Sequence, residues 1–197
     1  MRNPTLGRRL ALGGAPAVVA LSIVFTSFDA MPATPRDGKV LDSKGARLVD
    51  TDEQLLASYR LTLPVVGVAK RNLRDTYNER RGSGAHEALD IPAPRGTQVV
   101  AVGDGRVVKL FRSFAGGLTV YQFDPSERFA YYYAHLDRYE QNLTEGMMLK
   151  RGDAIGTVGS TGNARDDSPH LHFAIFKLGP QKQWWKGSAI NPFPLLN

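Results

Sequence analysis

The chain has 197 residues, a length typical of one domain with appended segments. It is 42% hydrophobic and 22% charged, which excludes an intrinsically disordered chain and one wholly embedded in a membrane. It contains no cysteine, which excludes disulfide bonds, thiolate metal sites and cysteine nucleophiles.

The first 30 residues differ in kind from the rest. Arg2, Arg8 and Arg9 precede an uncharged apolar run over residues 10–28, which is typical of an export signal or of a single membrane span. The run is long for a signal-peptide core and near the shortest length for a span, so residues 1–30 fit a cleaved signal peptide or an uncleaved anchor. Flanking arginines predict that the following residues lie outside the cytoplasmic membrane. We expect an exported, periplasmic or extracytoplasmic protein, held at the membrane through residues 10–28 if these are not cleaved.

The charge of the chain favours an anionic partner. Of the formal net charge of +6, the three arginines and Asp29 in the first 30 residues account for +2, which leaves +4 on the exported part. A mildly basic exported domain suits a cell-wall polymer or lipid headgroups. Basic residues interleaved with aromatics in a stripe are not found, and we expect no nucleic-acid partner.

The chain after the export segment predicts a linker and then a β domain. Residues 31–50 are polar and marked by prolines, as in a linker, and residues 51–60 predict a short helix capped by Thr51. Residues 61–68 form a short β-type run. We also hypothesise that residues before 61 lie across a binding groove as an inhibitory segment.

Four further β-rich runs follow, separated by turn residues rich in glycine, aspartate and proline. They cover residues 97–102, 106–111, 118–123 and 129–135. Such spacing is typical of antiparallel hairpins. We therefore predict an all-β domain over residues 61–197, with antiparallel sheets that form a sandwich or groove.

Two histidines lie two residues apart at the start of a predicted strand. Pro169 marks the strand start, and alternation then places His170 and His172 on one face, with Leu171 and Phe173 in the core. Two imidazoles on one face of a rigid strand suit a metal site or an acid–base pair. The alternative is a pair of half-exposed histidines on an edge strand.

The other two histidines also lie in motif-like places. His86 and Asp90 are four residues apart, and the glycines before them and prolines after them favour an extended segment over a helix. A histidine and a carboxylate suit Zn²⁺, and an aspartate that orients a surface histidine is the alternative. His135 ends a strand in which alternation places it on the same face as Tyr131 and Tyr133. It either reaches a groove or is a stacked structural histidine.

All four histidines of the chain thus fall in three motifs. Their number matches a catalytic zinc site that has three protein ligands, an open position for water and two further bases nearby.

Together these motifs resemble the lysostaphin-type (LytM-like) zinc endopeptidases, which cut peptidoglycan peptides. The resemblance runs from about residue 61 to residue 193 and rests on four ordered motifs: residues 85–96, 103–105, 133–136 and 159–173. It implies a fold of the duplicated-hybrid-motif type with one Zn²⁺ per chain at the floor of a groove. It also implies a zinc-dependent endopeptidase that hydrolyses peptide bonds in peptidoglycan stems or cross-bridges.

Carried over by position, the resemblance makes His86, Asp90 and His172 the zinc ligands. His135 and His170 become the catalytic pair, one as general base and the other as donor to the developing oxyanion, in an order that the resemblance leaves open.

The chain departs from the family at one position. Some members carry a tyrosine about six residues before the first zinc histidine, where this chain has Arg80, followed by Arg81. Arg81 is a candidate for stabilising an oxyanion or binding a substrate carboxylate.

Two other functions remain as alternatives. One is a catalytically silent wall-binding or amidase-activating domain of the same fold, a class in which metal ligands are lost. The other is a biotinyl- or lipoyl-type carrier, which needs a lysine at a hairpin tip. Lys150 lies just before the turn at Gly152, but the four histidines would then have no role.

Overall fold

The computed structural model describes residues 51–82 and 84–197. These residues all lie within one compact unit. Among them, no helix combines the length and the apolar character that a membrane crossing requires. The predicted export segment, residues 1–30, and the predicted linker, residues 31–50, lie outside the described residues.

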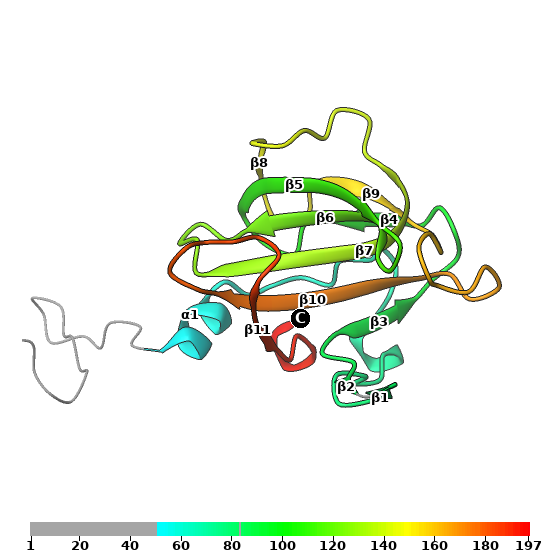
Figure 1. The fold of residues 1–197 in the computed structure, drawn as a ribbon, viewed down its shortest axis with the longest axis horizontal. Helices are drawn as coiled ribbons and strands as arrows, with labels where there is room; N and C mark the ends of the chain where they lie inside the picture. Colours follow the sequence, from blue (N-terminus) through cyan, green and yellow to red (C-terminus); the bar gives the residue numbers. More distant parts are fainter. Residues whose placement is uncertain (1–50, 83) are drawn as a thin grey trace, which may run out of the picture. The chain divides into compact units, whose positions relative to one another are not determined.

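Strands dominate the described part of the chain, as predicted (Figure 1). It opens with a short helix, a 3₁₀ turn and a small hairpin: α1 (Asp52–Ser58), η1 (Lys70–Asn72), β1 (Arg80–Arg81) and β2 (Gly84–Ala85). The strands that follow are β3 (Leu89–Pro92), β4 (Gln98–Val100), β5 (Gly105–Ser113), β6 (Gly117–Phe123), β7 (Phe129–Tyr139), β8 (Met148–Leu149), β9 (Ala154–Val158), β10 (His170–Leu178) and β11 (Gly187–Ile190), and a 3₁₀ turn, η2 (Phe193–Leu195), ends the chain.

One curled antiparallel sheet holds most of these strands. Within the described residues its order is β11-β10-β7-β6-β5-β8, with β3 paired to β10, and β9 paired to both β7 and β4. The prediction of a mostly β, antiparallel fold is confirmed. The β-type run predicted over residues 61–68 is not a strand, because only Val65 makes a bridge, to Val99.

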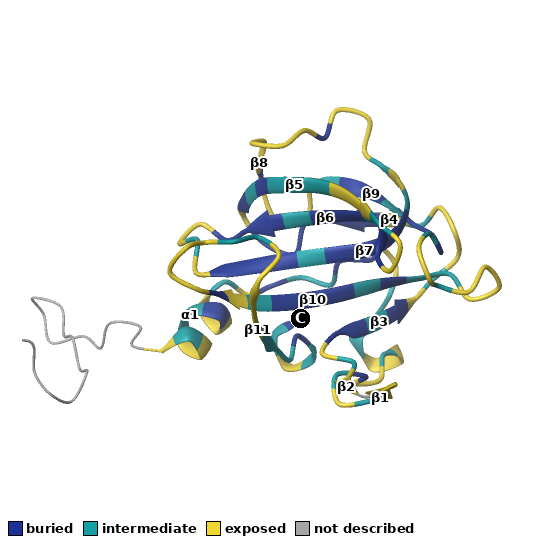
Figure 2. Ribbon diagram, viewed as in Figure 1, coloured by how far each residue is buried: buried dark blue, intermediate teal, exposed yellow. Residues whose placement is uncertain are grey.

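The central strands β7 and β10 are largely buried (Figure 2). Leu171, Phe173 and Ile175 of β10 and Tyr131 and Tyr133 of β7 are all fully buried. Each such side chain contributes roughly 1.5–3 kcal/mol when it leaves water. The alternation predicted for β10 is therefore confirmed, and its other face carries His172.

Helix α1 forms as predicted and packs on the domain. Thr51 and Gln54 form a capping box, and Leu56 is buried within the main core cluster. The Tyr59 hydroxyl donates to Asp124 Oδ2 at 2.8 Å, and the Asp52 carboxylate pairs with Lys177 and Arg128.

These contacts place α1 beside Lys177, near the end of β10 away from His170, as Figure 1 also shows. The hypothesis that residues before 61 lie across the groove is thus wrong for residues 51–60, because their contacts are made at the other end of the strand. Residues 31–50 lie outside the described residues.

The Asp52 ion pairs generate a prediction about pH. The hydrogen bond from Lys177, and that from Arg128, hold the pKa of Asp52 below its usual value, against burial, which raises it. An aspartate titrates near ~3.9 in an unfolded chain. Its stabilisation is therefore present above about pH 4 and is lost as the pH falls through the lower folded-state pKa. We expect Asp52→Asn to lower the free energy of unfolding by about 1 kcal/mol at pH 7 and by progressively less below pH 4.

Urea denaturation at several pH values checks this, with Glu53→Gln as the matched control. Glu53 is an exposed carboxylate in the same helical turn. An equal effect of the two substitutions at pH 7, or a loss in Asp52→Asn that does not change with pH, would contradict the account.

Candidate metal centre

The pairing of β3 with β10 brings Asp90 and His172 together. The two residues are direct cross-strand partners, so their side chains leave the sheet on the same face. The neighbouring pair, Leu171 and Ile91, points into the core. His86 reaches the same place from the segment between β2 and β3, where Glu87 has a left-handed backbone with φ of 56°.

Three potential ligand atoms converge at this point. His86 Nε2 lies 3.1 Å from His172 Nδ1 and 3.1 Å from Asp90 Oδ1, and His172 Nδ1 lies 3.2 Å from Asp90 Oδ1. Atoms bound to a tetrahedral zinc ion at about 2.0–2.1 Å lie roughly 3.3 Å apart. The triangle therefore has the size and the ligand chemistry of a zinc site.

Thr76 holds two of the three candidate ligands, His86 and Asp90, in place. Its carbonyl lies 3.1 Å from His86 Nδ1, so this nitrogen carries the proton and Nε2 presents its lone pair to the triangle. The Thr76 hydroxyl accepts a hydrogen bond from the backbone nitrogen of Asp90 at 3.0 Å and donates to the Ala88 carbonyl at 3.2 Å.

The electrostatics favour the ionisation states that metal binding requires. Burial raises the pKa of Asp90, but the hydrogen bond from His172 and the neighbouring imidazoles outweigh it and lower the pKa to about 2. Burial lowers the pKa of His86. At neutral pH the site thus holds a carboxylate anion and a neutral imidazole, the forms that bind a cation.

A β-bulge turns His135 toward this cluster. Between the pairs Leu118–Leu136 and Val120–Tyr133, two residues of β7 oppose the single residue Thr119 of β6. His135 has a left-handed backbone with φ of 60°, and its ring centroid lies 5.6 Å from that of His172.

The predicted face of His135 is therefore wrong. Tyr131 and Tyr133 are buried in the core, while His135 turns to the opposite side of the sheet, because a bulge breaks the alternation of a regular strand. Its ring also lies 5.0 Å from that of His170.

His135 and His170 are oriented in the same way. His135 Nδ1 lies 2.8 Å from the Thr161 carbonyl, and His170 Nδ1 lies 2.9 Å from the Ser168 carbonyl. Each Nδ1 therefore donates a proton to its carbonyl, and each Nε2 is left as the basic nitrogen. His170 Nε2 lies 3.7 Å from Asp90 Oδ1. Burial lowers the pKa of His135 to about 4, so it is neutral at neutral pH.

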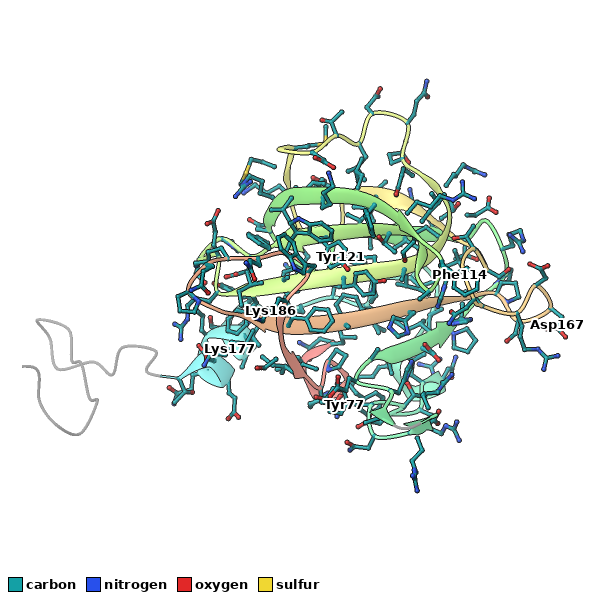
Figure 3. The ribbon with its side chains drawn as sticks, in the orientation of Figure 1. Tyr77, Phe114, Tyr121, Asp167, Lys177 and Lys186 are labelled. Carbon is teal, nitrogen blue, oxygen red and sulfur yellow. The ribbon has the colours of Figure 1, made fainter. Side chains whose placement is uncertain are left out.

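A cleft runs past these side chains, lined by Asp90, His135 and His170. One wall comes from residues 72–81 and the other from residues 163–168. At this end of the sheet lie the turn that carries Phe114, whose side chain is 92% exposed, and the loop that carries Asp167 (Figure 3).

The structure also locates other residues singled out in the sequence. Arg81 lines the cleft, and its Nη2 lies 2.8 Å from Asp90 Oδ2. Lys150, the carrier candidate, pairs with Asp104 at 2.9 Å. The carbonyls of Thr76, Thr161 and Ser168 could not be found from the sequence, because every residue type offers the same backbone carbonyl.

A family comparison matches residues 84–192 to the family described as "Peptidase family M23". Among curated proteins, the chain is 38% identical over 139 residues to the peptidoglycan DD-endopeptidase ShyC of Vibrio cholerae, with 62% of this chain and 31% of that protein covered. It is 30% identical over 113 residues to the murein hydrolase activator NlpD of Escherichia coli, with 57% of this chain and 26% of that protein covered.

Among solved structures, the chain is similar to the catalytic domain of the antimicrobial peptidase lysostaphin from Staphylococcus simulans. The TM-score is 0.51 and the identity 27%, with 72% of this chain and 94% of that chain covered. The chain spans at most 40% of the length of the first curated relatives it matches.

The Thr161 carbonyl, which orients His135, lies in a turn whose backbone packs closely against the hairpin of β5 and β6. Gly162 has φ of +82°, and a Cβ there would lie 2.3 Å from the Gly117 nitrogen and 2.5 Å from the Ala115 oxygen. We expect Gly162→Ala to separate the Thr161 turn from the hairpin of β5 and β6. The expected loss is about 1 kcal/mol for the left-handed backbone and a further 1–3 kcal/mol for the clash.

Gly146→Ala is the matched control, because Gly146 has φ of +89° but open space around its Cβ position. Its expected cost is the backbone part alone, about 1 kcal/mol. Urea denaturation of both variants measures the difference, and equal losses would show that the contact is not tight.

Proposed function

Because the chain belongs to peptidase family M23, we propose that it is a zinc-dependent endopeptidase that hydrolyses peptide bonds in peptidoglycan stems or cross-bridges. The observation that carries this proposal is the triangle of His86 Nε2, Asp90 Oδ1 and His172 Nδ1, with separations of 3.1–3.2 Å. The similarity to the peptidoglycan DD-endopeptidase ShyC of Vibrio cholerae also supports it.

The proposed metal ligands are His86, Asp90 and His172, which hold one Zn²⁺ per chain. When bound, zinc supplies Lewis acidity, which polarises a carbonyl and makes a water molecule more acidic. The cleft that opens beside these residues leaves space for a peptide, since one side of the cluster faces it.

His135 and His170 are the proposed catalytic pair. Each presents a basic Nε2, because each Nδ1 proton is held by a backbone carbonyl. One imidazole accepts a proton from the attacking water as general base. The other takes up a proton at Nε2 and, in that form, donates a hydrogen bond to the oxygen of the scissile carbonyl. The protonated general base then delivers its proton to the leaving amine.

A catalytically silent activator or wall-binding domain is the second candidate function. The similarity to a murein hydrolase activator favours it. The set of three ligands with two further histidines favours the enzyme, because a binding domain has no need to orient basic nitrogens toward a cleft. The two functions differ in one outcome: only the enzyme releases soluble peptides from peptidoglycan.

The chain has three parts in this proposal. Residues 1–30 serve as a signal peptide or signal anchor, residues 31–60 as a linker with a short helix, and residues 61–197 as the catalytic domain of the duplicated-hybrid-motif type. The exported domain acts outside the cytoplasmic membrane, held there through residues 10–28 if they are not cleaved. Peptidoglycan endopeptidase activity supports this location, since the substrate lies there.

The central prediction separates metal binding from proton transfer. In the full chain, purified in detergent, we expect one zinc per chain and release of peptides from purified peptidoglycan. A chelator should abolish the release, and added zinc should restore it. His172→Ala should lose both zinc and activity. His170→Ala and His135→Ala should retain zinc but lose at least about 10²-fold in kcat.

Gln141→Ala, an exposed position in the loop after β7, is the control for substitution itself. Zinc content by elemental analysis and peptide release by chromatography are the two measurements. If the wild-type protein binds zinc but releases no peptides from peptidoglycan, the result would favour the catalytically silent activator over the enzyme. Full activity in His170→Ala and His135→Ala would remove these residues from the mechanism.

A further inference from the structure

Arg81 contacts the proposed metal ligand Asp90 directly. Its Nη2 lies 2.8 Å from Asp90 Oδ2, while Asp90 Oδ1 faces His86 and His172. We propose that Arg81 is a positioning residue of the metal centre, which holds the outer oxygen of Asp90 so that the carboxylate offers zinc only Oδ1. This inference rests on the proposed function, since it concerns the same metal site.

The two oxygens of Asp90 have separate partners. The side chain of Asp90 is only 16% exposed, and that of Arg81 is 52% exposed. The more exposed guanidinium therefore contacts Oδ2 of a mostly buried carboxylate, while the imidazoles of His86 and His172 contact Oδ1. A charge-assisted hydrogen bond of this kind fixes the orientation of a carboxylate as well as adding binding energy.

The hairpin of β1 and β2 holds Arg81 in this position. Arg81 pairs with Gly84 across the hairpin, and its Nη2 also lies 3.4 Å from Glu79 Oε2. The Glu79 carbonyl accepts a hydrogen bond from the backbone nitrogen of His86 at 2.8 Å. Residues 79–86 therefore supply both the proposed ligand His86 and Arg81, which orients the proposed ligand Asp90.

Glu79 in turn is held by a second arginine. Arg74 Nη2 lies 2.5 Å from Glu79 Oε1, so positive and negative side chains alternate from Arg74 through Glu79 and Arg81 to Asp90. The guanidinium of Arg81 is engaged by two carboxylates. This engagement favours a role in orienting Asp90 over the substrate-carboxylate role that the sequence suggested.

The consequence for metal binding follows from carboxylate chemistry. A carboxylate that is free to rotate can bind a metal through one oxygen or through both, whereas one held at Oδ2 presents a single, fixed oxygen. Removal of such an outer hydrogen-bond partner typically weakens metal affinity by about 10–100-fold. The choice between one-oxygen and two-oxygen ligation also changes the coordination number, which a spectroscopic metal reports.

The test compares Arg81→Leu, Arg81→Lys and Arg80→Leu with wild type in the full chain in detergent. Arg80 is the matched control, because it is an exposed arginine on the same two-residue strand. Zinc affinity is measured by competition with a chromophoric chelator. We expect Arg81→Leu to bind zinc about 10–100-fold more weakly, Arg81→Lys to regain part of the loss, and Arg80→Leu to match wild type.

A second measurement uses Co²⁺ in place of zinc. Visible absorption of Co²⁺ is stronger in a four-coordinate than in a five-coordinate site. We expect Arg81→Leu to lose part of this absorption at saturating Co²⁺, and Arg80→Leu to keep the wild-type spectrum.

The failures of the two proposals are distinguishable. If wild type binds zinc but Arg81→Leu matches Arg80→Leu in affinity and in the Co²⁺ spectrum, the positioning role is overturned while the proposed function stands. If wild type binds no zinc, the proposed function fails, and the role of Arg81 fails with it.

Discussion

The antiparallel pairing of β3 with β10 is the constraint on which the rest of the site depends. It places Asp90 opposite His172 on the face toward the cleft, and Leu171 opposite Ile91 in the core. A shift of one residue in a strand moves every side chain to the other face. Such a slip would bury the Asp90 carboxylate and expose Leu89 and Ile91, so the register that builds the hydrophobic core is also the one that the proposed ligand set requires.

Backbone carbonyls also determine which ring nitrogen is left free in three of the four histidines, His86, His135 and His170. Carbonyls of Thr76, Thr161 and Ser168 each accept the Nδ1 proton of one histidine. The orientation of His135 also requires a bulge and a left-handed backbone, which costs of order 1–3 kcal/mol. The buried strands around it offset this cost, as is usual where strain serves a functional site.

Alternation of residues along a strand predicts much of the fold around the site, and it fails where the backbone departs from a regular strand. Alternation predicts the two faces of β10 correctly, because β10 is regular. The same rule fails for His135, since a bulge inserts a residue that alternation does not count. Residues 61–68 have β-type composition, yet only Val65 makes a bridge.

The sequence shows which residues have metal-binding side chains, but it does not show which side chains touch in the folded domain. Histidine and aspartate at motif spacing suit a zinc site, because few residue types bind zinc. The resemblance to the family, and not the spacing alone, selects His86, Asp90 and His172 as the ligand set. The sequence drew attention to Arg81, but its contact with Asp90 depends on how the β1–β2 hairpin lies against β3. Contacts of this kind arise from tertiary packing and leave no local signal.

X-ray absorption spectroscopy at the zinc edge tests the central claim most directly, since it reads the ligands of the bound ion. With one zinc per chain, the account predicts a first shell of nitrogen and oxygen atoms at about 2.0–2.1 Å, together with the outer scattering of two imidazole rings. Replacing His172 with alanine should remove the bound ion. Zinc surrounded by oxygen alone, without imidazole scattering, would contradict the assignment of His86 and His172 as ligands.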